Sequence, residues 1–186
     1  MKPGEFVTAD HHLGHKNIIK YTNRPFEHVD EMDDFLIRAW NEKVPPGAIV
    51  YHLGDFSMRK PQAIRNYLRR LNGTIRLVRG NHDRGIKGDL LGCFDWVKDY
   101  YESKCVDGTK VVMCHYAFQV WNKSHHGAWD LHGHSHNSLH QPDWMKRMDV
   151  GVDCHPNYEP FSFGEIVDYM EKKDFKAQDH HGSERK

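Results

Sequence analysis

Polar side chains that can bind metal ions follow several short apolar runs of this sequence, at the points where those runs end. Imidazole, carboxylate and amide groups recur there without a thiolate, a donor set that suits Mn²⁺, Fe or Zn²⁺ more than Cu(I) or an iron–sulfur cluster. The candidates are seven residues: Asp10, His12, Asp55, Asn81, His115, His134 and His136. One transition-metal ion takes about four to six ligands, whereas two ions sharing a bridging carboxylate would use the whole set. The set therefore indicates a site for two metal ions.

Each fragment taken alone also has a structural explanation. Asp10 with His12 is compatible with a capped turn, Gly54-Asp55 with the start of a helix, and His115 with a buried core histidine. Their joint occurrence, each after a predicted strand, favours the metal site, because ligands of α/β sheets bind at the carboxyl ends of strands.

The stretch Gly80-Asn81-His82-Asp83 places an amide, an imidazole and a carboxylate side by side after an apolar strand. Asn81 supplies a neutral oxygen ligand, His82 can carry a proton, and Asp83 can orient the imidazole ring. A polar turn is the alternative, because Asn, Asp and Gly are common turn formers. The other strand ends favour the functional interpretation.

The elements that must position these residues follow from hydrophobic periodicity. Apolar strands are predicted at 6–9, 48–51 and 74–78, separated by amphipathic helices at 30–43 and 61–71. This alternation predicts parallel strands joined by crossover helices. The second half differs, with predicted strands at 96–106, 110–114 and 147–152, another short strand that ends within 131–136, and a final helix that includes 163–170. The first two of these read as a hairpin turning at Asp107-Gly108.

Chain length and charge limit the domain organisation and the classes of partner that the protein can bind. The chain of 186 residues is predicted to form one domain over 1–172 and a polar tail over 173–186. Lys and Arg together number 26, as do Asp and Glu, which argues against a nucleic-acid or membrane binder held by bulk charge. The segment 59–87 is locally basic. Its basic residues are explained either by a solvated helix face or by a positive field near an anionic substrate, and the helix face is favoured for most of them.

Cysteine usage and hydropathy predict a cytoplasmic protein. The four cysteines form no CxxC pair, and no secretory signal precedes them, so reduced thiols are expected. No apolar run approaches the roughly 18–20 residues that span a bilayer. Oligomeric state stays open at this level.

The motifs, in order, resemble the five blocks of the calcineurin-like metallophosphoesterases. The blocks are Asp10-x-His12-x-Gly14, Gly54-Asp55, Gly80-Asn81-His82-Asp83, His115 and Gly133-His134-Ser135-His136. The flanking residues, including 149–153, resemble a small bacterial and phage branch of that family. One departure is Cys114, where many members have Gly, so the close backbone approach that Gly allows is not guaranteed. The resemblance implies an α/β fold of two stacked mixed β-sheets flanked by helices.

The resemblance also implies a role for each candidate. One divalent metal would be held by Asp10, His12 and His136, and the other by Asn81, His115 and His134. Asp55 would bridge the two metals. His82 would be the general acid, oriented by Asp83. Mn²⁺ is the metal we expect first, with Fe, Zn²⁺ or Ni²⁺ as alternatives.

The implied activity is hydrolysis of phosphate monoesters or diesters by metal-activated hydroxide, on a small phosphate-ester or nucleotide-like substrate. A metal-dependent nuclease is the alternative enzyme, and the neutral net charge counts against it. A non-catalytic scaffold with the same fold is less favoured, because degenerate members lose ligands or the proton-donor histidine, and here all are present.

Substrate specificity is expected in the loops at 16–28 and 117–129. Arg24 and Asn17 are candidates for contacting phosphate, with a local structural role around Pro25 as the alternative. The aromatic residues of 117–129 could stack a nucleobase or cover the sheet, and covering the sheet is the favoured interpretation.

Overall fold

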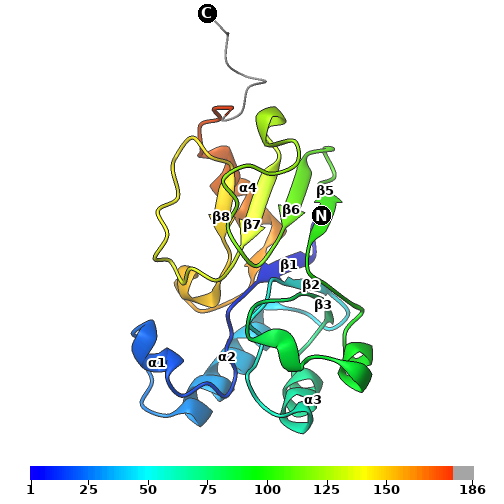
Figure 1. Ribbon diagram of the computed structural model, residues 1–186, viewed down its shortest axis with the longest axis vertical. Helices are drawn as coiled ribbons and strands as arrows, with labels where there is room; N and C mark the ends of the chain where they lie inside the picture. The colour runs from blue at the N-terminus through cyan, green and yellow to red at the C-terminus, as the bar shows by residue number, and fades with distance from the viewer. Residues whose placement is uncertain (178–186) are drawn as a thin grey trace, which may run out of the picture.

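The computed structural model describes residues 1–177 and contains two β-sheets with helices packed around them (Figure 1). The first sheet has the strand order β4-β3-β2-β1-β9, and the second has the order β5-β6-β7-β8. Both sheets mix parallel and antiparallel pairs. The predicted α/β class, with two stacked mixed sheets flanked by helices, is confirmed.

The first sheet is built from the alternating half of the chain. Its parallel strands are β1 (Glu5–Thr8), β2 (Ile49–His52), β3 (Thr74–Val78) and β4 (Trp96–Lys98). The connecting helices are α1 (Ile18–Tyr21), α2 (Val29–Lys43) and α3 (Pro61–Arg70). The strand β9 (Phe161–Ser162) adds an antiparallel edge beside β1. The predicted parallel order of the first three strands is confirmed.

The second sheet is built from the second half of the chain. Its strands are β5 (Tyr101–Lys104), β6 (Lys110–Met113), β7 (Trp129–His132) and β8 (Arg147–Asp149). The hairpin between β5 and β6 turns at the predicted Asp107-Gly108. The final helix α4 (Phe163–Glu171) starts at a capping box, in which Ser162 and Glu165 satisfy each other's backbone amides. Short 3-10 helices lie at Asp83–Gly85, Gly88–Cys93, Ser124–His126 and Val152–Cys154.

One predicted strand is two strands in the structure. The run 96–106 forms two strands, β4 and β5, which belong to different sheets. The break falls at Asp99 and Tyr100, where the chain passes from the first sheet to the second. Alternating apolar residues predict extended backbone on both sides of this break, but they do not show which sheet each half joins. The two-residue strand β9 was not predicted, because it is too short to carry a period.

Two apolar clusters hold the layers together. Leu36 and Trp40 of α2 and Ile64 of α3 pack against Val50 and Leu77 of the first sheet. The second cluster joins the two sheets and α4, through residues that include Val7, Leu53, Met113, Leu131 and Ile166. Both faces of the first sheet are therefore buried, as its short apolar strands require.

The loop 117–129 covers the outer face of the second sheet. Trp121 is buried against Val112, Ala128 and Met145, and its indole nitrogen donates to the Ala128 carbonyl at 3.0 Å. A buried indole of this kind is not available to stack a nucleobase. The structure thus agrees with the favoured interpretation of this aromatic loop.

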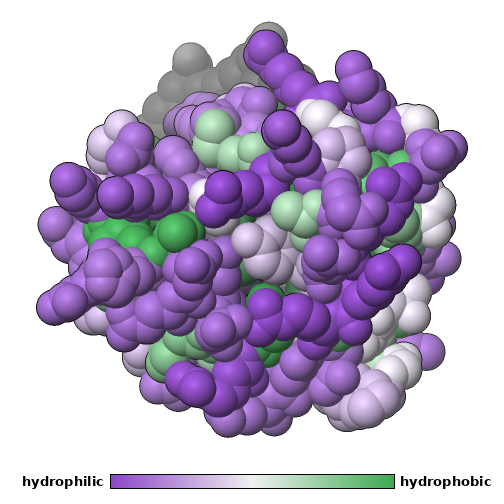
Figure 2. Space-filling model, turned by 90° about the horizontal axis from the view of Figure 1, so that it is seen from below, coloured by the Kyte–Doolittle hydropathy of each residue, from purple (hydrophilic) through white to green (hydrophobic). Residues whose placement is uncertain are grey.

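The packed part of the chain continues past the predicted domain end at 172. Lys173 is buried, and its ammonium donates to the Pro142 carbonyl at 3.0 Å, while the Lys176 amide donates to Trp144. Residues 178–186 of the predicted tail lie outside the described residues. Within 1–177, no helix is long and apolar enough to cross a membrane. The face shown in Figure 2 is mostly hydrophilic, with small separate hydrophobic areas.

The first cluster generates a stability prediction. Leu36 is fully buried between α2 and the first sheet, so Leu36→Ala removes packed methyl groups and leaves a cavity. We expect the free energy of unfolding to fall by about 2–5 kcal/mol in urea titrations. Val106→Ala is the control, because Val106 is 70% exposed and should change stability by less than about 0.5 kcal/mol. Equal losses in the two variants would contradict this assignment of the core.

Candidate metal centre

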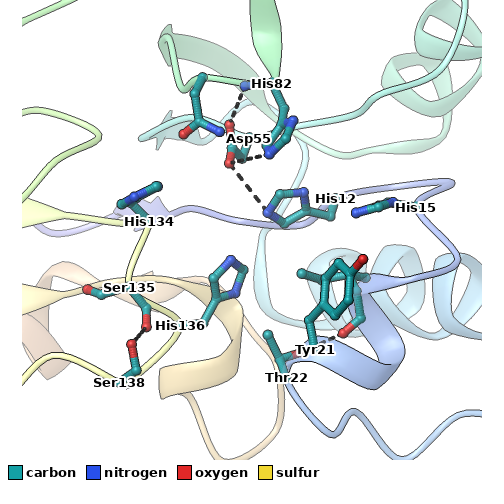
Figure 3. Close-up of a pocket in the computed structure, with 12 residues that line it drawn as sticks. His12, His15, Tyr21, Thr22, Asp55, His82, His134, Ser135, His136 and Ser138 are labelled. Atoms are coloured by element: carbon teal, nitrogen blue, oxygen red, sulfur yellow. Dashed lines mark hydrogen bonds and ion pairs between the residues drawn. The ribbon is translucent and has the colours of Figure 1, made fainter.

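The seven candidate ligands lie in the loops that directly follow five strands. Asp10 and His12 follow β1, and Asp55 follows β2. The others follow β3, β6 and β7: Asn81, His115, His134 and His136. The structure brings the candidates together where the carboxyl ends of both sheets meet, and Figure 3 shows His12, Asp55 and His136 from these loops facing one pocket.

Most of these residues have left-handed backbone conformations. Residues other than glycine rarely adopt a positive backbone angle φ. A strained backbone of this kind costs about 1–3 kcal/mol per residue. Five candidate ligands do so: Asp10 (60°), His12 (51°), Asp55 (55°), His134 (69°) and His136 (46°). Such conformations persist where the surrounding structure enforces them, and they cluster at functional sites. Here they turn successive loop side chains toward one point.

Glycines let the ligand loops approach one another closely. A Cβ atom on Gly80 would lie 2.2 Å from Oδ1 of Asp55, and one on Gly133 would lie 2.7 Å from Oδ2 of Asp10. Cys114, which stands where the family often has Gly, does not displace its neighbour. Its thiol is buried 4.0 Å from the Asp99 carbonyl, and His115 still reaches the site.

The first group of ligand atoms is formed by Asp10, His12 and His136, which offer atoms within 4.8 Å of one another. Oδ1 of Asp10 and both ring nitrogens of His12 are buried without a hydrogen-bond partner. Buried polar atoms are normally satisfied, so unpaired ones need an explanation. A cation between these side chains would satisfy them, and this group therefore fits a divalent metal.

The second group consists of Asp55, His115 and His134, again within 4.8 Å. Nδ1 of His115 donates to the Leu53 carbonyl at 2.8 Å, which leaves Nε2 directed at the site. Oδ1 of Asn81 lies 3.1 Å from that nitrogen. The predicted neutral oxygen ligand is thus beside the predicted imidazole ligand.

Asp55 belongs to the second group and also faces the first. Its Oδ2 is 3.4 Å from Nε2 of His12 in the first group and 3.5 Å from Nε2 of His115 in the second. Its Oδ1 accepts a hydrogen bond from the His82 backbone amide at 2.9 Å. One carboxylate therefore faces both groups, as a bridging ligand must.

Burial sets the protonation of these groups. Burial raises the pKa of Asp10 to about 7 and lowers the pKa of His12 to about 2. Burial also acts to raise the pKa of Asp55, but hydrogen bonding and charge from His115 outweigh it and hold this pKa well below its usual range. His12 is thus neutral and Asp55 anionic near neutral pH. A nearby cation would favour the anionic form of Asp10 as well.

His82 lies at the open side of this centre. Its side chain is 36% exposed, and Nε2 is 4.0 Å from Oδ2 of Asp55. The ring also packs edge-on to His12, with centroids 5.3 Å apart. His82 is therefore accessible from the pocket and adjacent to the candidate bridging ligand.

Asp83 makes different contacts from those predicted. Its buried carboxylate accepts hydrogen bonds from the amides of Asp55 at 2.7 Å, Phe56 at 2.9 Å and Gly80 at 2.9 Å. None of its described hydrogen bonds reaches the His82 ring, so the predicted orienting contact is not seen. Asp83 is the first residue of a 3-10 helix, and its side chain is fully buried. It positions the loop that carries Asp55.

Arg24 and Asn17 are not placed for phosphate contact. The Arg24 guanidinium is buried and forms two 2.8 Å hydrogen bonds to Asp153. It also donates to the carbonyls of Asp10 and His11. Asn17 is exposed at the start of α1 and does not line the pocket. These contacts support the structural alternative for Arg24, whereas the Asn17 side chain makes no capping hydrogen bond at the start of α1.

Two aspartates, Asp149 at the end of β8 and Asp153 in the turn after it, support the centre, and neither was predicted as a site residue. Asp153 accepts a 2.6 Å hydrogen bond from Nδ1 of His136, which leaves Nε2 of that ring for a metal. Asp149 accepts from the hydroxyl of Ser135 at 2.9 Å and from the amide of Asn137 at 3.2 Å. The only sequence signal for them was the likeness of 149–153 to one branch of the family.

The pocket over the centre has a volume of about 390 Å³. Six candidate site residues line it: His12, Asp55, Asn81, His82, His134 and His136. The loop 16–28, predicted to govern specificity, contributes Ile18, Tyr21 and Thr22. The remaining lining residues are His15, Ser135 and Ser138. His15 was not predicted, because a lone polar residue beside the first motif carries no separate signal.

Comparisons with known proteins agree with this architecture. The family model described as calcineurin-like phosphoesterase matches residues 6–179. An uncharacterized protein of Methanocaldococcus jannaschii is 36% identical over 173 residues, which cover 90% of this chain and 91% of that protein. The Gene 66 protein of Mycobacterium phage L5 is 26% identical over 179 residues, which cover 80% and 86%.

A solved structure shares the fold. The crystal structure of a protein of unknown function from Aquifex aeolicus has a TM-score of 0.67 and 21% identity, and the match covers 90% of this chain and 99% of that one. At this identity the likeness concerns the fold alone.

A matched pair of glycine variants tests the packing of the centre. Gly80→Ala places a methyl group against Asp55, whereas a Cβ at Gly85 in the adjacent turn meets no atom within 4 Å. We expect Gly80→Ala to weaken divalent-metal affinity about 10- to 100-fold by calorimetric titration, and Gly85→Ala to leave it within about twofold. Unchanged affinity in Gly80→Ala would contradict the close approach described here.

Arg24 generates a second prediction, on stability. Removing Arg24 leaves the buried Asp153 carboxylate without its guanidinium partner, with only the His136 ring among the described residues still bonded to it, so Arg24→Ala should lower the free energy of unfolding by about 3–5 kcal/mol. Arg70→Ala is the matched control, because Arg70 pairs with Asp34 at the exposed surface and such pairs contribute about 0–1 kcal/mol. If Arg24→Ala were as stable as Arg70→Ala but bound substrate more weakly, the result would favour the predicted contact between Arg24 and phosphate.

Proposed function

The chain belongs to the calcineurin-like phosphoesterase family, and we propose that it is a phosphohydrolase with a centre for two divalent metal ions. The observation that carries this proposal is the position of Asp55, whose Oδ2 lies 3.4 Å from His12 and 3.5 Å from His115. It joins two ligand groups that include buried, unpaired polar atoms. Together these features support two ions that share one carboxylate.

Each metal has its own proposed ligands. Asp10, His12 and His136 would hold one ion, and Asn81, His115 and His134 the other, with Asp55 between them. The nitrogen and oxygen donors favour Mn²⁺ first, with Fe, Zn²⁺ or Ni²⁺ as alternatives. When bound, two such ions activate water and neutralise charge on the phosphoryl oxygens.

The residues of the chain perform the proton chemistry and the positioning. His82 faces the pocket and donates its proton to the leaving oxygen as the bond from phosphorus to that oxygen breaks. General acid catalysis of this kind contributes typically about 10²–10⁴-fold. Asp83 holds the backbone of the Asp55 loop, and Asp153 fixes the His136 ring. The substrate is a small phosphate ester or a nucleotide-like compound, and we place the protein in the cytoplasm, where its four free cysteines stay reduced.

Two other functions are less well supported. A nuclease would need basic groups along the cleft to hold a polyanion, and the described pocket lining contains no Lys or Arg. A non-catalytic scaffold would not need a proton donor, yet His82 is accessible beside the candidate bridging ligand. The phosphohydrolase accounts for both observations.

Exchange of His82 tests the proposed general acid. We expect His82→Ala to retain its metal content and to lose about 10²-fold or more in kcat on Mn²⁺-loaded protein with an aryl phosphate ester. Asp55→Asn should instead lose bound metal, as measured by elemental analysis. His28→Ala provides the control for removal of an exposed histidine.

Two results would count against the proposal. An unchanged kcat in His82→Ala would remove His82 from the proton step. The absence of hydrolysis with each of Mn²⁺, Zn²⁺, Ni²⁺ and Fe²⁺ would favour the scaffold.

A further inference from the structure

Beyond the two proposed metal ions, the described wall of the pocket over the centre offers no Lys or Arg to compensate the charge of a phosphate. The pocket's described lining includes the imidazoles of His15 and His82 but neither Lys nor Arg. Arg24, one of the two predicted phosphate contacts, is instead held by Asp153. Sites that select a doubly charged phosphate monoester commonly use Arg or Lys on its free oxygens. A diester carries a single charge and needs less of this compensation.

A second pocket adjoins the first. It has a volume of about 380 Å³ and is lined by Tyr116, Ala117, Gly133, His134, Ser135, Ser138 and Leu139. Three of these residues also line the first pocket: His134, Ser135 and Ser138. The two pockets therefore lie on either side of a shared wall that includes a candidate metal ligand. A group attached to a phosphate at the centre can extend into either one.

Each pocket has an exposed tyrosine on its own side. Tyr21 lines the first and is 71% exposed, and Tyr116 lines the second and is 47% exposed. The Tyr116 ring lies 4.8 Å from the ring of His134, and its hydroxyl donates to Oδ1 of Asn81 at 3.4 Å. Exposed aromatic faces next to a reaction centre are suited to stacking planar groups.

The proton donor distinguishes the two sides. His82 lies 6.3 Å from His15, and His15 lies 6.2 Å from Tyr21, measured between ring centroids. Figure 3 shows His82, His15 and Tyr21 on one side of the pocket and His134, Ser135 and Ser138 on the other. A leaving group that receives its proton from His82 therefore lies on the Tyr21 side.

We propose that the substrate is a phosphodiester with two arms, of which the leaving arm lies against Tyr21 and the retained arm, an aromatic or nucleobase-like group, stacks on Tyr116. This inference rests on the proposed function. The oxygen of water bonds to phosphorus and one water proton passes to solvent. The bond from phosphorus to the leaving arm breaks, and that oxygen takes the proton of His82. The product that keeps the second arm is a phosphate monoester.

Paired substrates test the two arms on metal-loaded enzyme. Bis(4-nitrophenyl) phosphate has both arms, whereas 4-nitrophenyl phosphate has only the leaving arm. We expect wild type to prefer the diester in kcat/KM, and Tyr116→Ala to lower the diester-to-monoester ratio about tenfold, mainly through KM for the diester. Tyr21→Ala should lower kcat/KM for both esters and keep the ratio within about twofold. Tyr116→Phe, which keeps the ring and removes the bond to Asn81, should retain the ratio.

A control and a binding measurement separate this inference from the proposed function. Tyr100→Ala removes an aromatic ring that is 40% exposed but lines neither pocket, and it should leave the ratio unchanged. In the His82→Ala background, Tyr116→Ala should weaken calorimetric binding of diphenyl phosphate about tenfold.

The outcomes are distinct. Equal effects of Tyr116→Ala on the two esters, or a wild-type preference for the monoester, would overturn the two-arm inference while leaving the phosphohydrolase in place. Hydrolysis of neither ester would contradict the proposed function. The diphenyl phosphate comparison would then still decide whether Tyr116 binds the second arm.

Discussion

The loop after β2 is the part of the molecule on which the centre depends. Its carbonyl groups accept hydrogen bonds from neighbouring loops: Leu53 from the His115 ring, Gly54 from the Asp10 amide, and Asp55 from the His12 amide. The Asp55 amide in turn donates to Asp83 at 2.7 Å. Strand ends from both sheets are thus joined to one segment. Each of these hydrogen bonds fixes one neighbouring loop relative to Asp55. The Asp55 carboxylate, which faces both ligand groups, is positioned in this way.

Buried charge is the second constraint. Arg24, Asp153 and His136 form a continuous chain of hydrogen bonds that links the loop before α2 to a candidate metal ligand. An isolated buried carboxylate would be costly, and the bidentate guanidinium offsets that cost. The same contacts remove Arg24 from the pocket. A residue type often associated with phosphate binding therefore serves here to hold a ligand ring in place.

The walls of the pocket differ from its floor. The floor consists of ligands in enforced left-handed conformations on short loops between buried strands, and such a site is preorganised for metal ions. The walls consist of exposed side chains on α1 and on the loops after β6 and β7, including Tyr21 and Tyr116. The candidate metal ligands thus belong to the floor, and the proposed contacts to substrate belong to the exposed walls.

The sequence alone determined the parallel strands, the helices between them and the set of candidate ligands, because apolar periodicity and residue type are local properties. It placed Asn81 and His115 after strands, as the structure does. Only the tertiary structure assigned 96–98 and 101–104 to different sheets, turned Asp83 away from His82, and paired Arg24 with Asp153. Those outcomes depend on which buried polar groups meet across the fold. A partner that is 129 positions distant, as Asp153 is from Arg24, leaves no periodic signal in the chain.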